Sequence, residues 1–368
     1  VHNESFYDSK VLTGLKVRFS RGTLGTTAFL GAYNSLSLLN PQATIFGTGY
    51  TIPSDIANPN LTWQTNTETN YGVNLGFLKN RFTLGMDYYT SDVNGMLINQ
   101  SVSEVYGTSS VKLNAADVRS SGIELELSGV IISKKDFTWK AGANYSTVNS
   151  EITGLGNLDE LPAVQYGQSG RGPVFRNYIG GQVGEMWGIE TTGEVEMKYM
   201  SDPTEYIGKQ SGYSYAVDQN GDGVIDRTRT VEEGGDLVKI GQNTPDFYWG
   251  IFTQFSYKDF DFSLQFQGAH GGEVYNIDPL YYGSQWGRAL HSDFDADGDG
   301  IADHNGQHYV RNRDQTDAMI QDASYLALRN ITIGYTMSPD FMKKIGFSSA
   351  RVYVASTNLL YIMGDDYT

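Results

Sequence analysis

Hydrophobic and polar residues alternate along much of this chain, in runs of nearly ten residues. In residues 260–267, for example, Phe262 and Leu264 alternate with Ser263 and Gln265. The same alternation recurs in three further runs, at 71–77, 82–88 and 137–146. Because successive side chains of a strand point to opposite faces, the pattern predicts strands with one apolar and one polar face. A tilted barrel strand crosses the hydrocarbon of a membrane in roughly 9–11 residues, which is the length of these runs.

Turns and loops alternate between these runs. Short polar turns are expected at 78–81, 133–136 and 257–259, and long irregular segments at 35–64, 91–116, 150–185, 199–245 and 271–320. Loops this long are uncommon within compact soluble domains. Short turns at one end and long loops at the other are typical of outer-membrane barrels. We therefore predict an all-β fold, an antiparallel transmembrane β-barrel with long extracellular loops.

The pattern predicts about 11 or 12 strands. They lie near 10–20, 23–33, 66–77, 81–92, 117–130, 136–149, 185–198, 246–257, 259–270, 321–336 and 349–360. A soluble β-sandwich could hold as many strands, but sandwich strands are usually shorter, about 5–6 residues.

Composition and charge narrow the class of protein to which this chain can belong. Aromatic residues make up 13% and charged residues 18% of the 368 residues, and no run of apolar residues is long enough to span a bilayer as a helix. The net charge of −16 argues against nucleic acid as a partner, because phosphate binding needs basic residues. The chain has no cysteine, which excludes disulfide scaffolds, thiolate nucleophiles and cysteine-ligated metals.

Two acidic loops have the spacing of calcium-binding loops. Hard oxygen donors at alternate positions, followed by a glycine that permits a sharp bend, suit Ca²⁺. The donors are Asp218, Asn220, Asp222 and Asp226 in the first loop, and Asp295, Asp297, Asp299 and Asp303 in the second. Arg229 and Gly306 stand where a bidentate Glu is usual, so EF-hand switching is not expected. The sequence predicts structural Ca²⁺ that pins each loop, with a solvated acidic turn as the alternative.

No enzyme signature is present. Glu124 and Glu126 share one face of a strand, an arrangement that a glycosidase could use, but we interpret them as part of a polar lumen wall. Aromatic loop residues could stack on sugar rings or simply pack within loops. They are Trp187, Tyr213, Tyr215, Tyr281, Tyr282 and Trp286.

Several short sequence motifs resemble motifs of the SusC/RagA-type TonB-linked outer-membrane proteins of Bacteroidota. The first is Asn-Pro-Asn-Leu-Thr-Trp-Gln at 58–64, where Gln64 stands at a position at which Glu is common in that family. Further phrases follow in family order at 77–82, 87–89, 121–125, 218–223, 324–335, 351–354 and 358–360. The resemblance covers roughly 58–368, and residues 1–57 are consistent with preceding strands.

The resemblance implies a nutrient importer and not an enzyme. Such importers have a barrel of about 22 strands closed by a plug. They are driven through TonB, and a SusD-like surface lipoprotein covers the extracellular mouth as a lid. Their substrates are glycans or peptides too large for porins. The implied location is the outer membrane, with its lipid as surroundings.

No plug, TonB-contacting segment or closing aromatic strand is recognised, and the polar start Val1-His2-Asn3-Glu4 is no signal peptide. We therefore expect the chain to be a partial barrel, with the other strands elsewhere. The alternatives are a siderophore or cobalamin receptor of the same fold, and a soluble calcium-binding surface protein that acts on carbohydrates.

Overall fold

The computed structural model describes most of the chain. The described residues are 11–27, 35–36, 40–44, 47–51, 55–103, 105, 110–161, 164–165, 174–191, 217–222, 225–226, 228–276 and 315–364. Within these ranges no helix is both long and apolar enough to traverse a bilayer.

Strands dominate the structure. They are β1 (Leu12–Thr26), β2 (Asn40–Thr44), β3 (Gly47–Thr51), β4 (Asp55–Ile56), β5 (Gln64–Phe77), β6 (Phe82–Ser101), β7 (Ser110–Lys134), β8 (Phe137–Ser146), β9 (Asn149–Leu155), β10 (Val164–Gln165), β11 (Val174–Phe175), β12 (Glu185–Gly188), β13 (Val238–Gln242), β14 (Phe247–Tyr257), β15 (Phe260–His270), β16 (Glu273–Tyr275), β17 (Ile320–Asp322), β18 (Tyr325–Thr336) and β19 (Arg351–Met363). The described residues also include two short helices, η5 (Asp317–Met319) and α3 (Pro339–Lys344).

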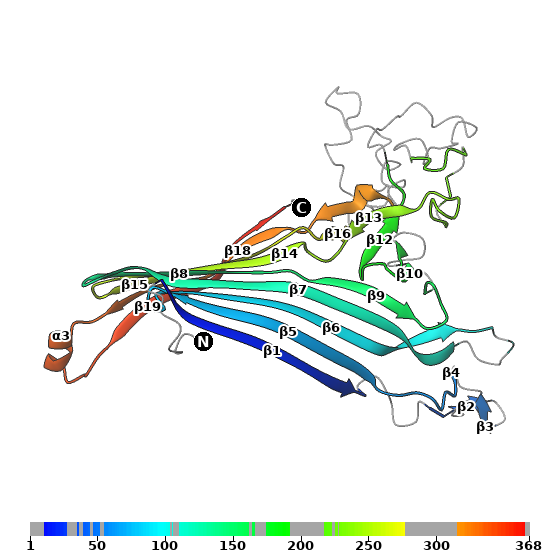
Figure 1. Ribbon diagram of the computed structural model, residues 1–368, viewed down its shortest axis with the longest axis horizontal. Coiled ribbons are helices and arrows are strands. Elements are labelled where there is room, and N and C mark those ends of the chain that lie inside the picture. The colour runs from blue at the N-terminus through cyan, green and yellow to red at the C-terminus, as the bar shows by residue number, and fades with distance from the viewer. Residues whose placement is uncertain are drawn as a thin grey trace.

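The long strands form one antiparallel sheet, in the order β1-β5-β6-β7-β8-β14-β15-β18-β19 (Figure 1). Tight turns join β5 to β6, β7 to β8 and β14 to β15 at the same end of the sheet, which confirms the three predicted hairpins. Left-handed backbone at Leu78, Lys79, Asn80 and Lys258 closes two of these turns. The edges β1 and β19 do not pair with each other, so the described strands form an open section of barrel wall. In a bilayer such edges must be paired by further strands.

One face of this sheet is apolar and the other is mostly polar, and this difference holds across all of the long strands. One register row crosses all of the long strands through Val17, Val73, Met86, Leu125, Tyr145, Trp249, Gly268, Leu326 and Ile362. The adjacent row, on the opposite face, contains Lys16, Asn74, Gly85, Glu126, Asn144, Gly250, Gln267, Ala327 and Tyr361. The first row is apolar apart from one glycine, and the second is mostly polar or small, as a wall between lipid and water requires.

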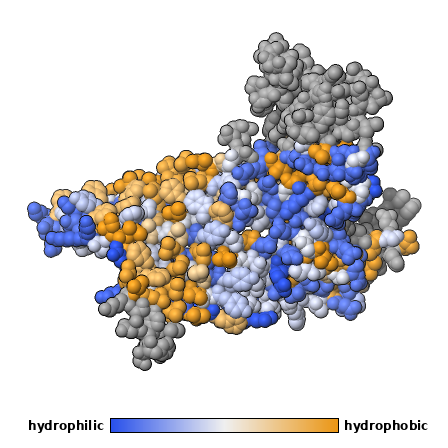
Figure 2. Space-filling model, turned by 45° about the horizontal axis from the view of Figure 1, so that its top comes forward, coloured by the Kyte–Doolittle hydropathy of each residue, from blue (hydrophilic) through white to orange (hydrophobic). Residues whose placement is uncertain are grey.

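The apolar face is exposed and not packed into a core. Ile333 and Val354, which lie beside Phe262 in the register, are 51% and 74% exposed. Apolar side chains gather over the part of the molecule that ends in the short turns, whereas the other end is largely hydrophilic (Figure 2). This confirms the predicted fold class, with Phe262 and Leu264 on the lipid-facing side, and argues against the soluble alternative.

The predicted loop 91–116 is wrong for most of its length. β6 has 20 residues and β7 has 25, so both continue well beyond the length needed to cross a membrane. Their outer ends pack with β9 around a small core of Ala116, Ile152 and Leu155. The alternation of apolar and polar residues predicted only the membrane-crossing part of each strand, because beyond the bilayer both faces of a strand meet water or a loop.

Three predicted strands need correction. The segments 10–20 and 23–33 are not two separate strands, because β1 runs without a turn from Leu12 to Thr26 and pairs with β5 throughout. Residues 28–33 lie outside the described part. The predicted barrel strand 185–198 is also wrong, because β12 ends at Gly188 and belongs to the separate sheet β10-β11-β12-β13. That small sheet lies at the end of the molecule away from the tight turns (Figure 1).

Candidate functional site

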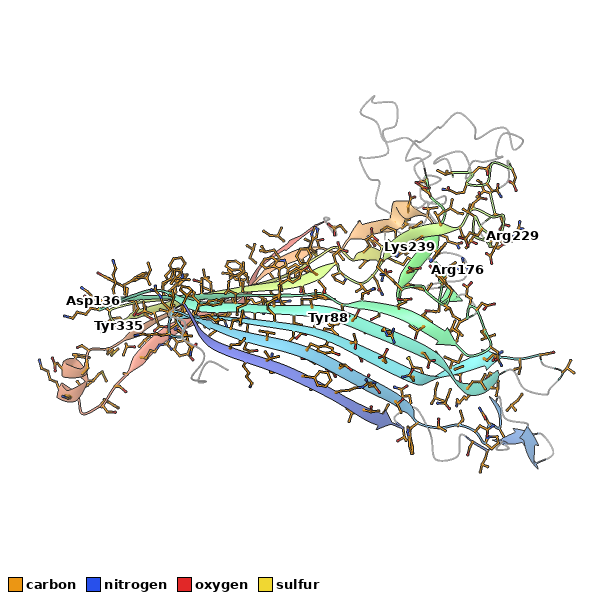
Figure 3. The ribbon with its side chains drawn as sticks, viewed as in Figure 1. Tyr88, Asp136, Arg176, Arg229, Lys239 and Tyr335 are labelled. Carbon is orange, nitrogen blue, oxygen red and sulfur yellow. The ribbon has the colours of Figure 1, made fainter. Side chains whose placement is uncertain are left out.

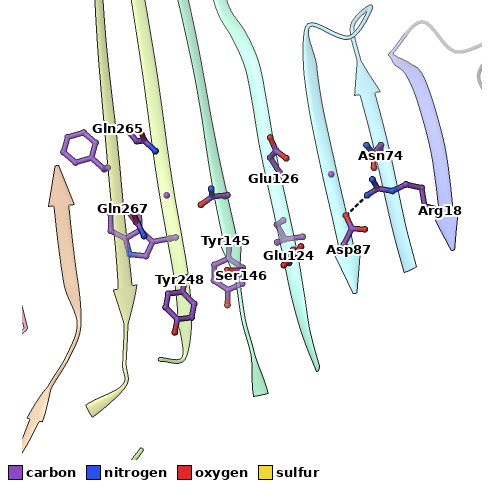
Figure 4. Close-up of a pocket in the computed structure, with 16 residues that line it drawn as sticks. Arg18, Asn74, Asp87, Glu124, Glu126, Tyr145, Ser146, Tyr248, Gln265 and Gln267 are labelled. Atoms are coloured by element: carbon purple, nitrogen blue, oxygen red, sulfur yellow. Dashed lines mark hydrogen bonds and ion pairs between the residues drawn. The ribbon is translucent and has the colours of Figure 1, made fainter. Parts of the chain in front are cut away.

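The polar face of the sheet bounds an open hollow of about 610 Å³. Strands β1, β5, β6, β7, β8, β14 and β15 each contribute side chains to it, which lie across neighbouring strands (Figure 4). The hollow lies on the face that alternation assigned to the lumen. It is therefore a candidate surface for solutes passing through the barrel.

One ion pair lies at an end of this hollow. The guanidinium of Arg18 on β1 contacts the carboxylate of Asp87 on β6 at 2.6 Å, across the intervening strand β5. The pair neutralises Asp87 where it lines the hollow and ties three strands together. Sequence reasoning missed it, because the two residues are 69 positions apart.

Glu124 and Glu126 also line the hollow, from consecutive lumen-facing positions of β7. Asn144 lies opposite Glu126 and Ser146 opposite Glu124 on β8. Within the described residues, neither carboxylate has a hydrogen-bond or ion-pair partner. Two carboxylates and the amides around them can bind hydroxyl or amide groups of a passing solute.

The opposite end of the lumen wall carries a cation. Arg329 donates to Gln267 at 3.2 Å and to Asn358 at 2.9 Å. Its guanidinium also lies 5.9 Å from the ring centres of both Tyr325 and Tyr361, which stack on each other. These contacts fix the orientation of Gln267 at the rim of the hollow.

A buried carboxylate organises the small sheet at the extracellular end. Glu185 is 5% exposed and accepts hydrogen bonds from Lys239, the Gln182 N–H, Tyr178 and Trp187. Burial by itself would raise the pKa of Glu185, but these donors outweigh it and leave the pKa below its usual value.

Hydrogen bonds and ring contacts also hold the aromatic neighbours of Glu185 in place. Burial, and then the hydrogen bond to Glu185, raise the pKa of Tyr178 to about 12. Arg176 pairs with Glu160 and lies 4.9 Å from the centre of the Trp187 ring. Figure 3 places Arg176 and Lys239 together at this end, far from Asp136 and Tyr335 at the tight turns. Trp187 is therefore held by packing and hydrogen bonding, whereas Tyr213, Tyr215, Tyr281, Tyr282 and Trp286 lie outside the described residues.

The first acidic loop is held by hydrogen bonds within the protein. The Asp218 carboxylate accepts the N–H of Gly221 at 2.7 Å, and the Asn220 side-chain oxygen accepts the N–H of Asp222 at 2.9 Å. Asp226 accepts from Thr228 and pairs with Arg229 at 2.6 Å. These bonds to Asp226 hold its pKa well below the usual range.

Asp236 is the centre of this loop, and sequence reasoning missed it. It is fully buried and accepts the N–H groups of Gln219 at 2.8 Å and Asp226 at 2.7 Å. The described residues contain no group of three or more His, Cys, Asp or Glu side chains arranged to hold a metal. Calcium at Asp218, Asn220, Asp222 and Asp226 stays a prediction. The second loop, with Asp295, Asp297, Asp299 and Asp303, lies outside the described residues.

Comparison with known proteins gives consistent matches. Residues 14–167 match the family model described as "TonB dependent receptor-like, beta-barrel". TonB-dependent receptor P3 of Formosa agariphila is 28% identical over 365 residues, which are 96% of this chain and 35% of that protein. TonB-dependent receptor SusC of Bacteroides thetaiotaomicron is 27% identical over 356 residues, covering 91% of this chain and 33% of SusC.

A solved structure shares the fold. The RagAB peptide importer in its 'open-open' state aligns with a TM-score of 0.76 and 22% identity, over 99% of this chain and 38% of that one. The chain thus spans about a third of the length of the relatives that it matches.

Proposed function

We propose that the whole protein imports oligosaccharides or peptides across the outer membrane, on the premise that this chain is part of the β-barrel of a TonB-dependent receptor, whose family model residues 14–167 match. The polar lumen wall carries the proposal. From Lys16 on β1 to Tyr361 on β19, one face offers charged, amide, hydroxyl or small groups while the other meets lipid. A sheet that is polar on one face and leaves an apolar face exposed on the other suits a wall between a water-filled lumen and lipid.

The proposal includes two partners. TonB would supply the energy, and a SusD-like lipoprotein would cover the extracellular mouth. The names of the relatives support both, since they include TonB-dependent receptors, among them SusC, and the RagAB peptide importer. The relatives are receptors or transporters, and we propose no enzymatic activity for this protein.

The lumen wall supports glycans or peptides as the cargo. Glu124, Glu126, Gln265 and Gln267 present carboxylates and amides to the hollow. These groups hydrogen-bond well to hydroxyl-rich sugars and to peptide backbones. Iron chelates and cobalamin remain the competing cargo, to be separated by experiment.

Uptake in cells tests the function. A strain that lacks the full-length gene should lose accumulation of labelled oligosaccharides or peptides, and the restored gene should recover it. A strain without TonB should lose the same uptake. Growth that is lost only on a siderophore or cobalamin would contradict the proposal.

Lumen variants locate the transport path. The double variant Glu124→Gln/Glu126→Gln should alter uptake several-fold for charged cargo, while the level of assembled protein stays the same. Lys135→Gln, in the β7–β8 turn outside the lumen, is the control and should transport normally. Equal uptake of charged cargo by both variants would show that Glu124 and Glu126 do not act on the cargo along its path.

A further inference from the structure

The hairpin between β18 and β19 is built differently from the other tight turns. The β7–β8 and β14–β15 connections need only two residues each, Lys135-Asp136 and Lys258-Asp259. The β18–β19 connection uses residues 337–350 and contains helix α3, at the same end of the sheet (Figure 1). Because tight turns mark the periplasmic end of such barrels, α3 lies on the periplasmic side.

Helix α3 is capped at both ends, although it has only six residues. The Ser338 hydroxyl accepts the N–H of Phe341, and Pro339 occupies the first turn. At the other end, the N–H of Gly346 bonds to Lys343 and the N–H of Phe347 bonds to Met342. Gly346 has the left-handed conformation that this closure requires, with φ 82°. The helix is therefore a defined element and not a frayed loop.

This defined hairpin leaves large apolar side chains uncovered. Phe341, Ile345 and Phe347 are 52%, 50% and 62% exposed, whereas Met342 is buried. Phe341 and the C-cap residue Ile345 are four residues apart and so lie on the same side of the helix. Lys343 and Lys344 provide positive charge in the last turn. Exposed apolar residues beside lysines are the composition of a helix that rests in a membrane interface.

The hairpin continues the lipid-facing surface. Tyr335 and Val352 pair across β18 and β19 on the apolar face and are 38% and 56% exposed. The Met337 N–H bonds to Ala350, so the two strands lead directly into the hairpin. The helix begins two residues later, so it directly continues this surface.

We propose that α3 and Phe347 dock into the periplasmic leaflet of the outer membrane. Phe341, Ile345 and Phe347 enter the boundary between acyl chains and headgroups, and Lys343 and Lys344 bind phospholipid phosphates. The hairpin thereby fixes the depth of this part of the barrel in the bilayer. This inference needs the membrane location of the sheet and is independent of the cargo.

Spin labelling of the full-length protein tests the proposal. This chain has no cysteine, and any cysteine elsewhere in the full-length protein would be replaced by serine, so that the introduced cysteine is the only thiol. Labels at Phe341→Cys, Ile345→Cys and Phe347→Cys would be compared in vesicles of phosphatidylethanolamine and phosphatidylglycerol. We expect access to dissolved oxygen to exceed access to a water-soluble nickel chelate several-fold. Asp340→Cys on another side of α3 and Lys135→Cys in the short turn are matched controls, expected to favour the nickel chelate.

Two outcomes overturn the proposal. Nickel access at Phe341 equal to that at Lys135 would place the hairpin in water. Low access to both reagents would mean that a protein covers it. If the cysteine variants fail to assemble, Phe341→Trp in vesicles with brominated lipid chains gives the same decision, because only a membrane-embedded indole is quenched more than in Lys135→Trp.

A variant without the lysine charges separates the contribution of the lysines to membrane binding from that of the apolar side chains. Lys343→Gln/Lys344→Gln should move the label at Phe341 toward water in vesicles with phosphatidylglycerol, and should have little effect in phosphatidylcholine alone. No shift in either lipid would remove phosphate binding from the proposal.

Discussion

The carboxylate of Asp87 and the guanidinium of Arg18 meet over Gly72, on the strand that separates them. Gly72 is the register partner of both residues, and a β-carbon there would stand 2.8 Å from the guanidinium nitrogens. The same arrangement recurs near the other edge of the sheet, where Asp261 and Arg351 meet over Gly334. In each case a glycine makes room for an ion pair that links alternate strands on the lumen face.

Gly72→Val should therefore separate Arg18 from Asp87. We expect a cost of about 1 kcal/mol in barrel stability, at the low end for overpacking because the ends of two flexible side chains can move. The measurement is unfolding of the full-length protein in detergent with increasing urea. Gly85→Val is the matched control, since a β-carbon at Gly85 meets only ordinary contacts at 3.9 Å. Equal stability of the two variants would contradict the role of Gly72.

Arginine at neighbouring positions of β15 should give opposite results. Leu264→Arg puts a charge on the lipid-facing side and should cost about 2–4 kcal/mol if it lies near the bilayer midplane. Gln265→Arg puts the same charge on the lumen side and should cost little. Both can be measured by reversible folding into lipid vesicles. Similar losses from the two variants would refute the assignment of faces.

The network around Glu185 should make the small sheet sensitive to acid. Because the pKa of Glu185 is lowered in the folded state, its stabilising effect is present above the unfolded pKa of about 4.3 and is lost as the pH falls through the folded value. Hydrogen exchange of β12 and β13, corrected for intrinsic rates, should therefore rise in acid. Glu185→Gln should exchange faster at neutral pH and lose most of this acid dependence. An identical pH profile in both proteins would exclude Glu185 as the cause.

Calcium binding can be tested in each acidic loop separately. Chelation should lower the thermal midpoint of the full-length protein if calcium pins these loops. Asp222→Ala and Asp297→Ala should each remove part of that response without preventing assembly. Because Arg229 pairs with Asp226, Arg229→Glu should strengthen calcium binding by freeing Asp226 and adding a carboxylate. Thermal unfolding that is unchanged by chelator in the unsubstituted protein would leave the loops as solvated acidic turns.

The sequence by itself determined which side chains face lipid and which face the lumen. Phe262 and Ser263 lie on opposite sides because side-chain direction alternates along any strand, whatever its partners. The same local reasoning located the tight turns at 78–81 and 257–259, where polar residues interrupt the alternation.

Only the tertiary structure decided which strands meet and what lies beyond the membrane. The pairing of β8 with β14 brings Asn144 beside Gly250, and that of β1, β5 and β6 brings Arg18 to Asp87. No local pattern encodes a contact between residues so far apart in sequence. The sequence pattern likewise did not predict the outer ends of β6 and β7, because outside the bilayer no lipid requires one face of a strand to be apolar.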